Sequence, residues 1–235
     1  MSLPIIASPK YTIEIPSTGT AAEYRPFLVK EEKVLLIAQE SQDQGQIMNA
    51  IKDVIRACTY NKVDVDNLTS YDLEYLFIKL RSKSVGEIST VGLKCTECDS
   101  QNEIDINLDE IKVMGSAPDG RVQLTDTVGV NMKPMSVKDM SKIASKKDMS
   151  TADQMTESVI ACIDSIYDEN KVYPKTSYSR SDMETFVNSL ARLQMQKIEA
   201  FITNLPKVEH TIKFKCSKCS CENEQSLSGI RSFFS

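Results

Sequence analysis

Two matched pairs of cysteines limit what this chain can fold into. The first pair is Cys95 and Cys98, and the second is Cys216 and Cys219, each with two residues between its thiols. That spacing is typical of a zinc knuckle, a tight turn that directs both sulfurs at one ion. Two knuckles supply four ligands, which completes a tetrahedral site. The sequence therefore predicts one structural zinc ion per chain, held by these four cysteines.

The residues around the two pairs repeat. A lysine precedes the first cysteine of each pair, at Lys94 and Lys215, and an Asn-Glu dipeptide follows each pair at the same offset, at 102–103 and 223–224. These flanks predict two similar strand–knuckle–strand units that together form one zinc ribbon. The loop between the pairs is several times longer than the roughly 12 to 20 residues of an ordinary finger. The predicted ribbon is therefore discontinuous and brackets a folded insertion.

Other interpretations of the cysteines and of the histidine are less well supported. Disulfides within the pairs would suit a redox protein, but no thioredoxin-like βαβ pattern surrounds them. Cys221 is either a competitor for the metal or a bystander, and we expect a bystander. Cys58 and Cys162 are expected to be small core residues. The single histidine, His210, precedes the second knuckle by too many strand residues to be a good ligand, so we expect it to be solvated.

Composition indicates a globular protein. Its seven cysteines, four of them in metal-binding spacing, indicate a reducing compartment. The chain has 235 residues, of which 41% are hydrophobic and 26% charged, and its net charge is −5. A net negative charge gives no overall reason to expect nucleic-acid binding. Residues 1–7 contain no basic segment and only a short apolar run, which predicts no signal peptide. No run approaches the ~18 apolar residues of a membrane span.

Hydrophobic periodicity predicts an α+β fold, with a helix-rich body, small β hairpins and the discontinuous ribbon. Three domains are expected: an N-terminal hairpin and helical region at 1–90, the ribbon from 91–111 and 208–235, and a mainly helical insertion at 112–207. The expected hairpins pair 10–15 with 23–25 and 121–124 with 129–132. The expected helices span 29–39, 43–57, 71–81, 151–167 and 181–204.

Catalytic signatures are missing from the sequence. Any histidine-based triad would have to use His210, the single histidine, which lies on the expected strand before the second knuckle, and neither of the common glycine-rich phosphate loops occurs. Adjacent acids such as Glu31 and Glu32 are typical of a solvated face. Four thiolates would also close the coordination shell of the metal. We therefore expect no enzyme, no catalytic residue and no organic cofactor.

Two further segments bear on binding. The basic run from Lys142 to Lys147 lacks aromatic residues and is flanked by acids, so a solvated helix surface is favoured over a nucleic-acid site. Phe233 and Phe234, near the C-terminus, either pack on the core or anchor a partner.

Four stretches of the sequence resemble the baseplate hub proteins of T4-like contractile-tailed phages, that is, the central spike complex subunits or hub assembly proteins. These stretches are LPIIASPKY at 3–11, YRPFLVKEEK at 24–33, LEYLF at 73–77 and LRSKSVGE at 80–87.

The resemblance implies a non-enzymatic hub subunit or hub assembly factor that acts by contacts with other hub or tail proteins. It implies a location in the host cytoplasm during assembly, or in the tail baseplate of the virion. A zinc-ribbon protein that binds nucleic acid or assists transcription is the alternative. A hydrolase with an unfamiliar site is a third, which the lack of histidines disfavours. No membrane or small-molecule partner is expected.

Overall fold

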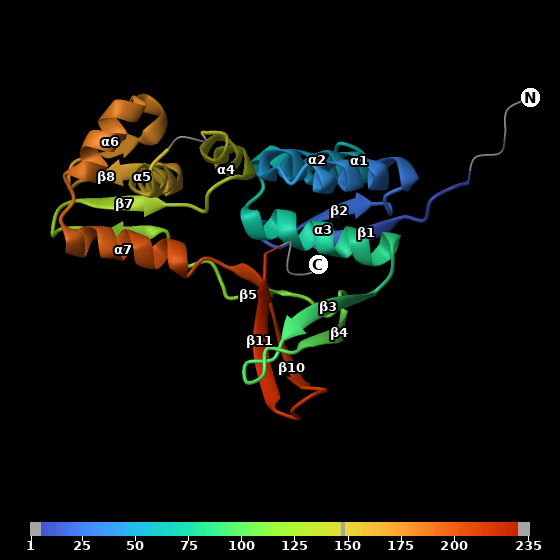
Figure 1. Ribbon diagram of the computed structural model, residues 1–235. Helices are drawn as coiled ribbons and strands as arrows, with labels where there is room; N and C mark the ends of the chain where they lie inside the picture. Colours follow the sequence, from blue (N-terminus) through green and yellow to red (C-terminus); the bar gives the residue numbers. More distant parts are fainter. Residues whose placement is uncertain (1–5, 147–148, 230–235) are drawn as a thin grey trace, which may run out of the picture. The chain divides into compact units, whose positions relative to one another are not determined.

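The computed structural model describes residues 6–146 and 149–229 and has the expected α+β fold (Figure 1). The chain divides into two compact units. The first unit, Met1–Met114 with Lys207–Ser235, combines both ends of the chain. The second unit, Gly115–Pro206, lies between them in the sequence.

The first unit begins with the predicted hairpin. Strand β1 (Tyr11–Ile15) pairs antiparallel with β2 (Thr20–Tyr24). Gly19 in the turn has a φ of +66°, a left-handed conformation that glycine adopts without a steric penalty. The tight turn is what allows the two strands to pair directly.

Three helices follow, and they confirm the helices predicted from the hydrophobic pattern. They are α1 (Val29–Glu40), α2 (Gln44–Cys58) and α3 (Ser70–Ser84), with a 3₁₀ turn, η1 (Val65–Asn67), before α3. Asp43 caps α2 by accepting a hydrogen bond from the Gln46 N–H at 3.0 Å. Apolar side chains in α3 follow the i, i+3, i+4, i+7 spacing of one helix face, and all four are buried: Leu73, Leu76, Phe77 and Leu80.

Asp72 joins the start of α3 to the N-terminal hairpin. Its carboxylate is fully buried and accepts hydrogen bonds from the Ser17 N–H at 2.8 Å and the Thr69 N–H at 3.1 Å. A buried carboxylate needs such donors because burial without them is costly. The same side chain therefore caps the helix and fixes the turn between β1 and β2.

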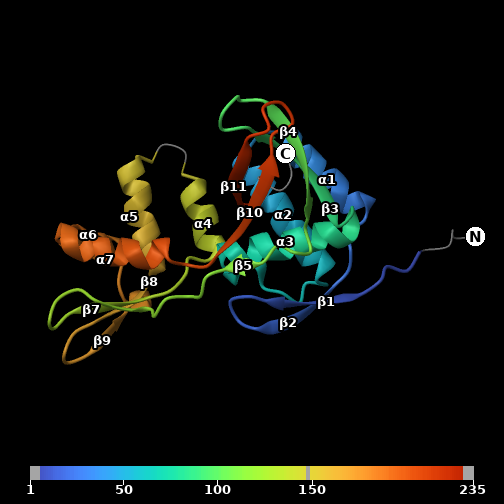
Figure 2. The same cartoon turned by 90° about the horizontal axis from the view of Figure 1, so that it is seen from below.

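Two further hairpins form the ribbon, and they lie side by side in both views (Figures 1 and 2). One consists of β3 (Ile88–Lys94) and β4 (Gln101–Asn107), the other of β10 (Lys207–Lys215) and β11 (Glu222–Ser228). The short strand β5 (Val113–Met114) pairs with the start of β10, opposite Lys207 and Val208.

Side chains from the two hairpins share one apolar core. Burial alternates along β3, as period-two strand geometry requires when one face is covered. The cluster also contains Tyr71 and Ile78 of α3, so this helix covers the ribbon core. The buried strand residues in it include Val91, Leu93, Ile106, Ile212, Phe214 and Leu227.

Polar contacts reinforce the junction between α3 and the ribbon. The Lys79 ammonium donates to the carbonyl of Leu108 at 3.1 Å and to that of Asp109 at 2.6 Å. The Asp109 carboxylate accepts hydrogen bonds from Ser82 and Lys83, each at 2.6 Å. The segment after β4 is thus held by three side chains from one helix.

The second unit has its own sheet and core. Four antiparallel strands follow the order β6 (Arg121–Gln123), β7 (Gly129–Met132), β8 (Ile163–Tyr167) and β9 (Val172–Pro174). Four helices accompany them, α4 (Val137–Ala144), α5 (Thr151–Cys162), α6 (Arg180–Asn188) and α7 (Arg192–Thr203), with a 3₁₀ turn, η2 (Lys175–Ser177). Buried residues from β7, β8, α5, α6 and α7 make one cluster with Leu124, which follows β6.

Two predicted helices in this unit are wrong in part. The helix expected to reach Tyr167 ends at Cys162, and the rest is strand β8, which pairs with β7 and β9. Ile163 fits a helical repeat, but it also alternates with Ser165 and Tyr167, which share its buried face. The helix expected over 181–204 is two helices, because the backbone of Ala191 is extended and begins α7 anew.

Within residues 6–146 and 149–229, no helix has both the length and the apolar run that crossing a bilayer requires.

We expect Asp109→Ala to lower the free energy of unfolding by about 1–3 kcal/mol, because the buried Ser82 hydroxyl would lose its acceptor. Hydrogen bonds from Lys83 and then Ser82 lower the pKa of Asp109. Its contribution is therefore present above the ordinary carboxyl pKa and is lost as the pH falls through the folded value. Urea unfolding at neutral and acidic pH measures both effects.

Glu110→Ala is the matched control, since this neighbouring carboxylate is exposed and should change stability by less than about 0.5 kcal/mol. Equal stabilities for the two variants would contradict the role assigned to Asp109.

Candidate metal centre

The four cysteines of the two pairs come together at the tips of the ribbon hairpins. Cys95 and Cys98 lie in the turn between β3 and β4, and Cys216 and Cys219 lie in the turn between β10 and β11. Their sulfurs all lie within 4.8 Å of one another. Two contacts cross between the hairpins: Cys95 Sγ to Cys219 Sγ at 3.6 Å, and Cys98 Sγ to Cys216 Sγ at 3.7 Å.

Both turns have the same backbone structure. The Cys95 N–H donates to the Ser100 carbonyl at 2.9 Å, and the Cys216 N–H donates to the Cys221 carbonyl at 2.8 Å. Asp99 and Ser220 follow the second cysteine of each pair, with φ values of 54° and 61°. This left-handed residue turns the chain back toward the second strand. The sequence repeat is therefore also a structural repeat.

Each hairpin supplies an asparagine to the turn of the other hairpin. Asn102 of β4 accepts hydrogen bonds from the Ser217 N–H at 2.9 Å and from the Ser217 hydroxyl at 3.0 Å. Asn223 of β11 accepts the equivalent pair from Thr96, also at 2.9 and 3.0 Å. Both asparagines are buried, at 5% and 4% exposure, so these bonds have little competition from water.

The same asparagines contact the sulfurs through their amide nitrogens. Asn102 Nδ2 lies 3.8 Å from Cys216 Sγ, and Asn223 Nδ2 lies 3.6 Å from Cys95 Sγ. Each nitrogen also donates to a backbone carbonyl of its own turn, that of Ser100 or Cys221. An outer group that orients a ligand atom and its loop together is typical of metal sites.

Ser100 and Cys221 break the symmetry of the site. The Ser100 hydroxyl lies 3.1 Å from Cys98 Sγ and 3.0 Å from Cys216 Sγ, so it touches one sulfur of each pair. Cys221 occupies the equivalent position in the other turn, but its thiol donates to the Glu222 carbonyl at 3.4 Å. The four-sulfur cluster does not include it.

The environment favours ionisation of some thiols over others. The Ser100 hydroxyl, followed by the backbone of Cys219, lowers the pKa of Cys216 to about 5. For Cys219, the backbone of Cys221 alone would lower the pKa, but the neighbouring thiols and burial raise it to about 12. Thiolates this close repel one another, so a cation is what would make ionisation of all four favourable.

The arrangement of sulfurs fits a tetrahedral metal ion. Bonds of about 2.3 Å from a metal to each sulfur place the sulfurs of a tetrahedron about 3.8 Å apart. The two distances across the hairpins, 3.6 and 3.7 Å, are close to that value. Four cysteines that lie this close could therefore bind one ion.

Cys58, Cys162 and His210, which the sequence also singled out, are not part of this cluster. Cys58 and Cys162 are buried, as expected of core residues, and burial raises the pKa of each to about 11. His210 lies within β10, half-buried and opposite Leu227 of β11. Phe233 and Phe234 fall outside the described residues.

The sequence pointed to the asparagines without revealing their role. Their repeated offset from the cysteines is visible in the sequence, but the partners, Thr96 and Ser217, lie on the opposite hairpin. Nothing in the sequence singled out Ser100, since the equivalent position holds a cysteine.

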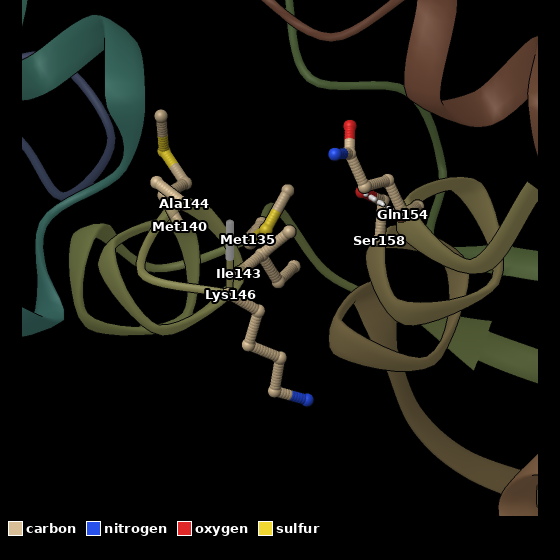
Figure 3. A pocket seen from close by; sticks show the side chains of 7 residues that line it. All are labelled: Met135, Met140, Ile143, Ala144, Lys146, Gln154 and Ser158. Carbon is tan, nitrogen blue, oxygen red and sulfur yellow. Dashed lines mark hydrogen bonds between the residues drawn. The ribbon is translucent and has the colours of Figure 1, made fainter. Parts of the chain in front are cut away.

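A groove of about 390 Å³ lies in the second unit, between α4 and α5 (Figure 3). Its one charged lining residue, Lys146, lies 3.4 Å from Glu157. Methionine and aliphatic side chains make up much of the rest, so the groove offers no nucleophile with an adjacent base. The lining residues are Met135, Met140, Ile143, Ala144, Lys146, Gln154 and Ser158.

We expect Asn102→Ala to lower metal affinity about 10- to 100-fold, the usual effect of removing an outer-shell partner. The change leaves the two Ser217 donors without their acceptor and removes one of the hydrogen bonds to the Ser100 carbonyl. Competition with a chromophoric chelator measures the affinity. Glu103→Ala, at the exposed neighbouring position, is the matched control. An unchanged metal affinity in Asn102→Ala would show that this asparagine does not support the site.

Comparison with known proteins identifies the family. A family model described as T4 bacteriophage base plate protein matches residues 8–235, nearly the whole chain. No curated protein and no solved structure matches it. The chain belongs to the T4 bacteriophage base plate protein family.

Proposed function

We propose that the protein is a non-enzymatic subunit or assembly factor of the baseplate hub, acts by contacts with other hub or tail proteins, and is stabilised by one zinc ion. The observation that carries the proposal is the family match over residues 8–235, because baseplate proteins work by assembling with one another. The resemblance of the N-terminal stretches to hub proteins supports the hub in particular.

Zinc is the metal that suits the site best. Four thiolates are soft donors, and a tetrahedral set of four sulfurs is typical of zinc or of an iron–sulfur cluster. The cluster is compact, with all sulfurs within 4.8 Å, which favours a single ion over a larger inorganic core. Cys95, Cys98, Cys216 and Cys219 would hold it.

The proposed role of the metal is structural. Four protein ligands leave no open position for water or substrate, which separates structural from catalytic zinc sites. A bound ion would join two hairpins that are far apart in the sequence, and its binding energy would contribute to folding. Cys216 and Cys95 are nearly fully buried, which limits access of substrates to the ion.

We expect the purified chain to contain one zinc ion. Cys216→Ser should lose it, and the midpoint of thermal unfolding should fall by roughly 5–15 °C, because the ribbon loses the link between its hairpins. Metal analysis by mass spectrometry and thermal melting provide the measurements. Cys221→Ser is the matched control, since this cysteine is outside the cluster and should keep both the zinc and the melting temperature.

Removal of the metal by a strong chelator should reproduce the effect of Cys216→Ser. Wild-type protein free of zinc, or with iron in its place, would contradict the proposed metal. A melting temperature that is unchanged by both treatments would contradict its structural role.

The hub role predicts a defect in assembly rather than in a chemical reaction. A phage that lacks this chain should accumulate incomplete baseplates, and the wild-type gene supplied from the host should restore complete tails. Electron microscopy of infected-cell lysates, with mass spectrometry of purified particles and assembly intermediates, measures this outcome. Normal baseplates without the protein, or its retention by DNA in place of tail proteins, would overturn the proposal.

A further inference from the structure

Helix α1 exposes apolar side chains on the side that faces away from its own core. Only Glu31 and Ala38 of its residues are buried. Leu36 is 52% exposed and Ile37 is 67% exposed. Large apolar side chains gathered on an exposed face commonly mark a contact with another protein. The other exposed apolar residues of this helix and its cap are Leu28, Val29 and Val34.

Two opposite charges lie on either side of Leu36 and Ile37. A rotation of 100° per residue places these four side chains within one sector of about 100° on the outer face of the helix. Lys33 lies about 5 Å before the midpoint of the apolar pair along the helix axis, and Glu40 lies about 5 Å after it.

Lys33 and Glu40 have no ion-pair partner among the residues that the structure describes, and both are exposed. The buried Glu31 of the same helix differs, because the Arg25 guanidinium binds it at 3.0 Å. Their separation by two turns prevents a direct contact between them. The outer face therefore presents a positive end, an apolar middle and a negative end.

We propose that this face of α1 is the contact through which two copies of the chain associate about a two-fold axis. In an antiparallel pair centred on Leu36 and Ile37, the apolar side chains of the two copies meet at the axis. Lys33 of each copy then lies opposite Glu40 of the other. A two-fold interface is built from the same patch on both copies, so a self-complementary patch is what it requires.

Charge complementarity favours a second copy over an unrelated helix. In the antiparallel pair, Lys33 and Glu40 of each copy both gain an oppositely charged partner. Because the arrangement is reciprocal, two such ion pairs form across the interface. In a parallel pair, Lys33 would instead meet Lys33 and Glu40 would meet Glu40. The helix has 12 residues and offers less surface than the roughly 800 Å² per partner of standard interfaces. The dimer is therefore weak and depends on concentration.

Sedimentation equilibrium of the full chain, over a range of concentrations, tests the proposal. The wild type should show a monomer–dimer equilibrium. Leu36→Gln with Ile37→Gln should be monomeric throughout, while its thermal melting and zinc content match those of the wild type, because both positions are exposed and glutamine is a good helix former. Leu193→Gln is the matched control: this α7 residue is 74% exposed and lies outside the patch.

Charge reversal tests the antiparallel arrangement. Lys33→Glu alone and Glu40→Lys alone should each weaken the dimer about tenfold, since two exposed pairs become repulsive. The double variant, Lys33→Glu with Glu40→Lys, should restore the wild-type affinity.

A wild-type chain that stays monomeric at its highest soluble concentration would overturn the proposal. So would a dimer that survives Leu36→Gln with Ile37→Gln, or a charge-swapped variant that fails to recover. None of these results would affect the proposed zinc site, which is measured separately on the same samples.

Discussion

The exchange of asparagine side chains between the two ribbon hairpins is the contact on which the rest of the first unit depends. Asn102 completes the turn that carries Cys216, and Asn223 completes the turn that carries Cys95. Neither knuckle has its full set of hydrogen bonds alone. Each hairpin therefore depends on the other for its hydrogen bonds, and a bound ion would strengthen the same contact.

This arrangement connects the site to the helices. The apolar cluster between the hairpins includes Ile78 and Tyr71 of α3, and Lys79 and Ser82 of the same helix bind the segment that follows β4. At its other end, α3 is capped by Asp72, which also binds the turn of the N-terminal hairpin. One helix thus links the N-terminal hairpin to the ribbon. Unfolding of the ribbon would therefore destabilise the whole first unit.

Local patterns explain which features could be predicted from the sequence. The cysteine spacing and its repeated flanks predicted the cluster of four sulfurs, and the apolar periodicity of α3 predicted its buried face. The crossed asparagines escaped assignment because their partners lie on the other hairpin, beyond the reach of any local pattern.

The two helices that the sequence predicted wrongly also ended where local patterns gave no clear signal. Residues 163–167 carry both a helical and an alternating repeat, and pairing with β7 and β9 decided between them. The break before α7 depends on the extended backbone of Ala191, which no glycine or proline marks. For residues 163–167 the outcome was therefore set by pairing with other strands. At the second place the Ala191 N–H donates to the Gln194 side chain at 2.8 Å, a local cap that starts the new helix.

The pairing of β5 with β10 gives the second unit an unusual position in the topology of the chain. Met114 lies opposite Lys207, and Val113 lies opposite Val208, so the segment 115–206 begins and ends at neighbouring points of one antiparallel ladder. Topologically, the whole second unit is the loop of a β-hairpin. Ordinary hairpins close with two to five residues. A chain that replaced this unit by such a short turn would keep every strand of the ribbon, so the second unit is topologically separable from the ribbon that carries it.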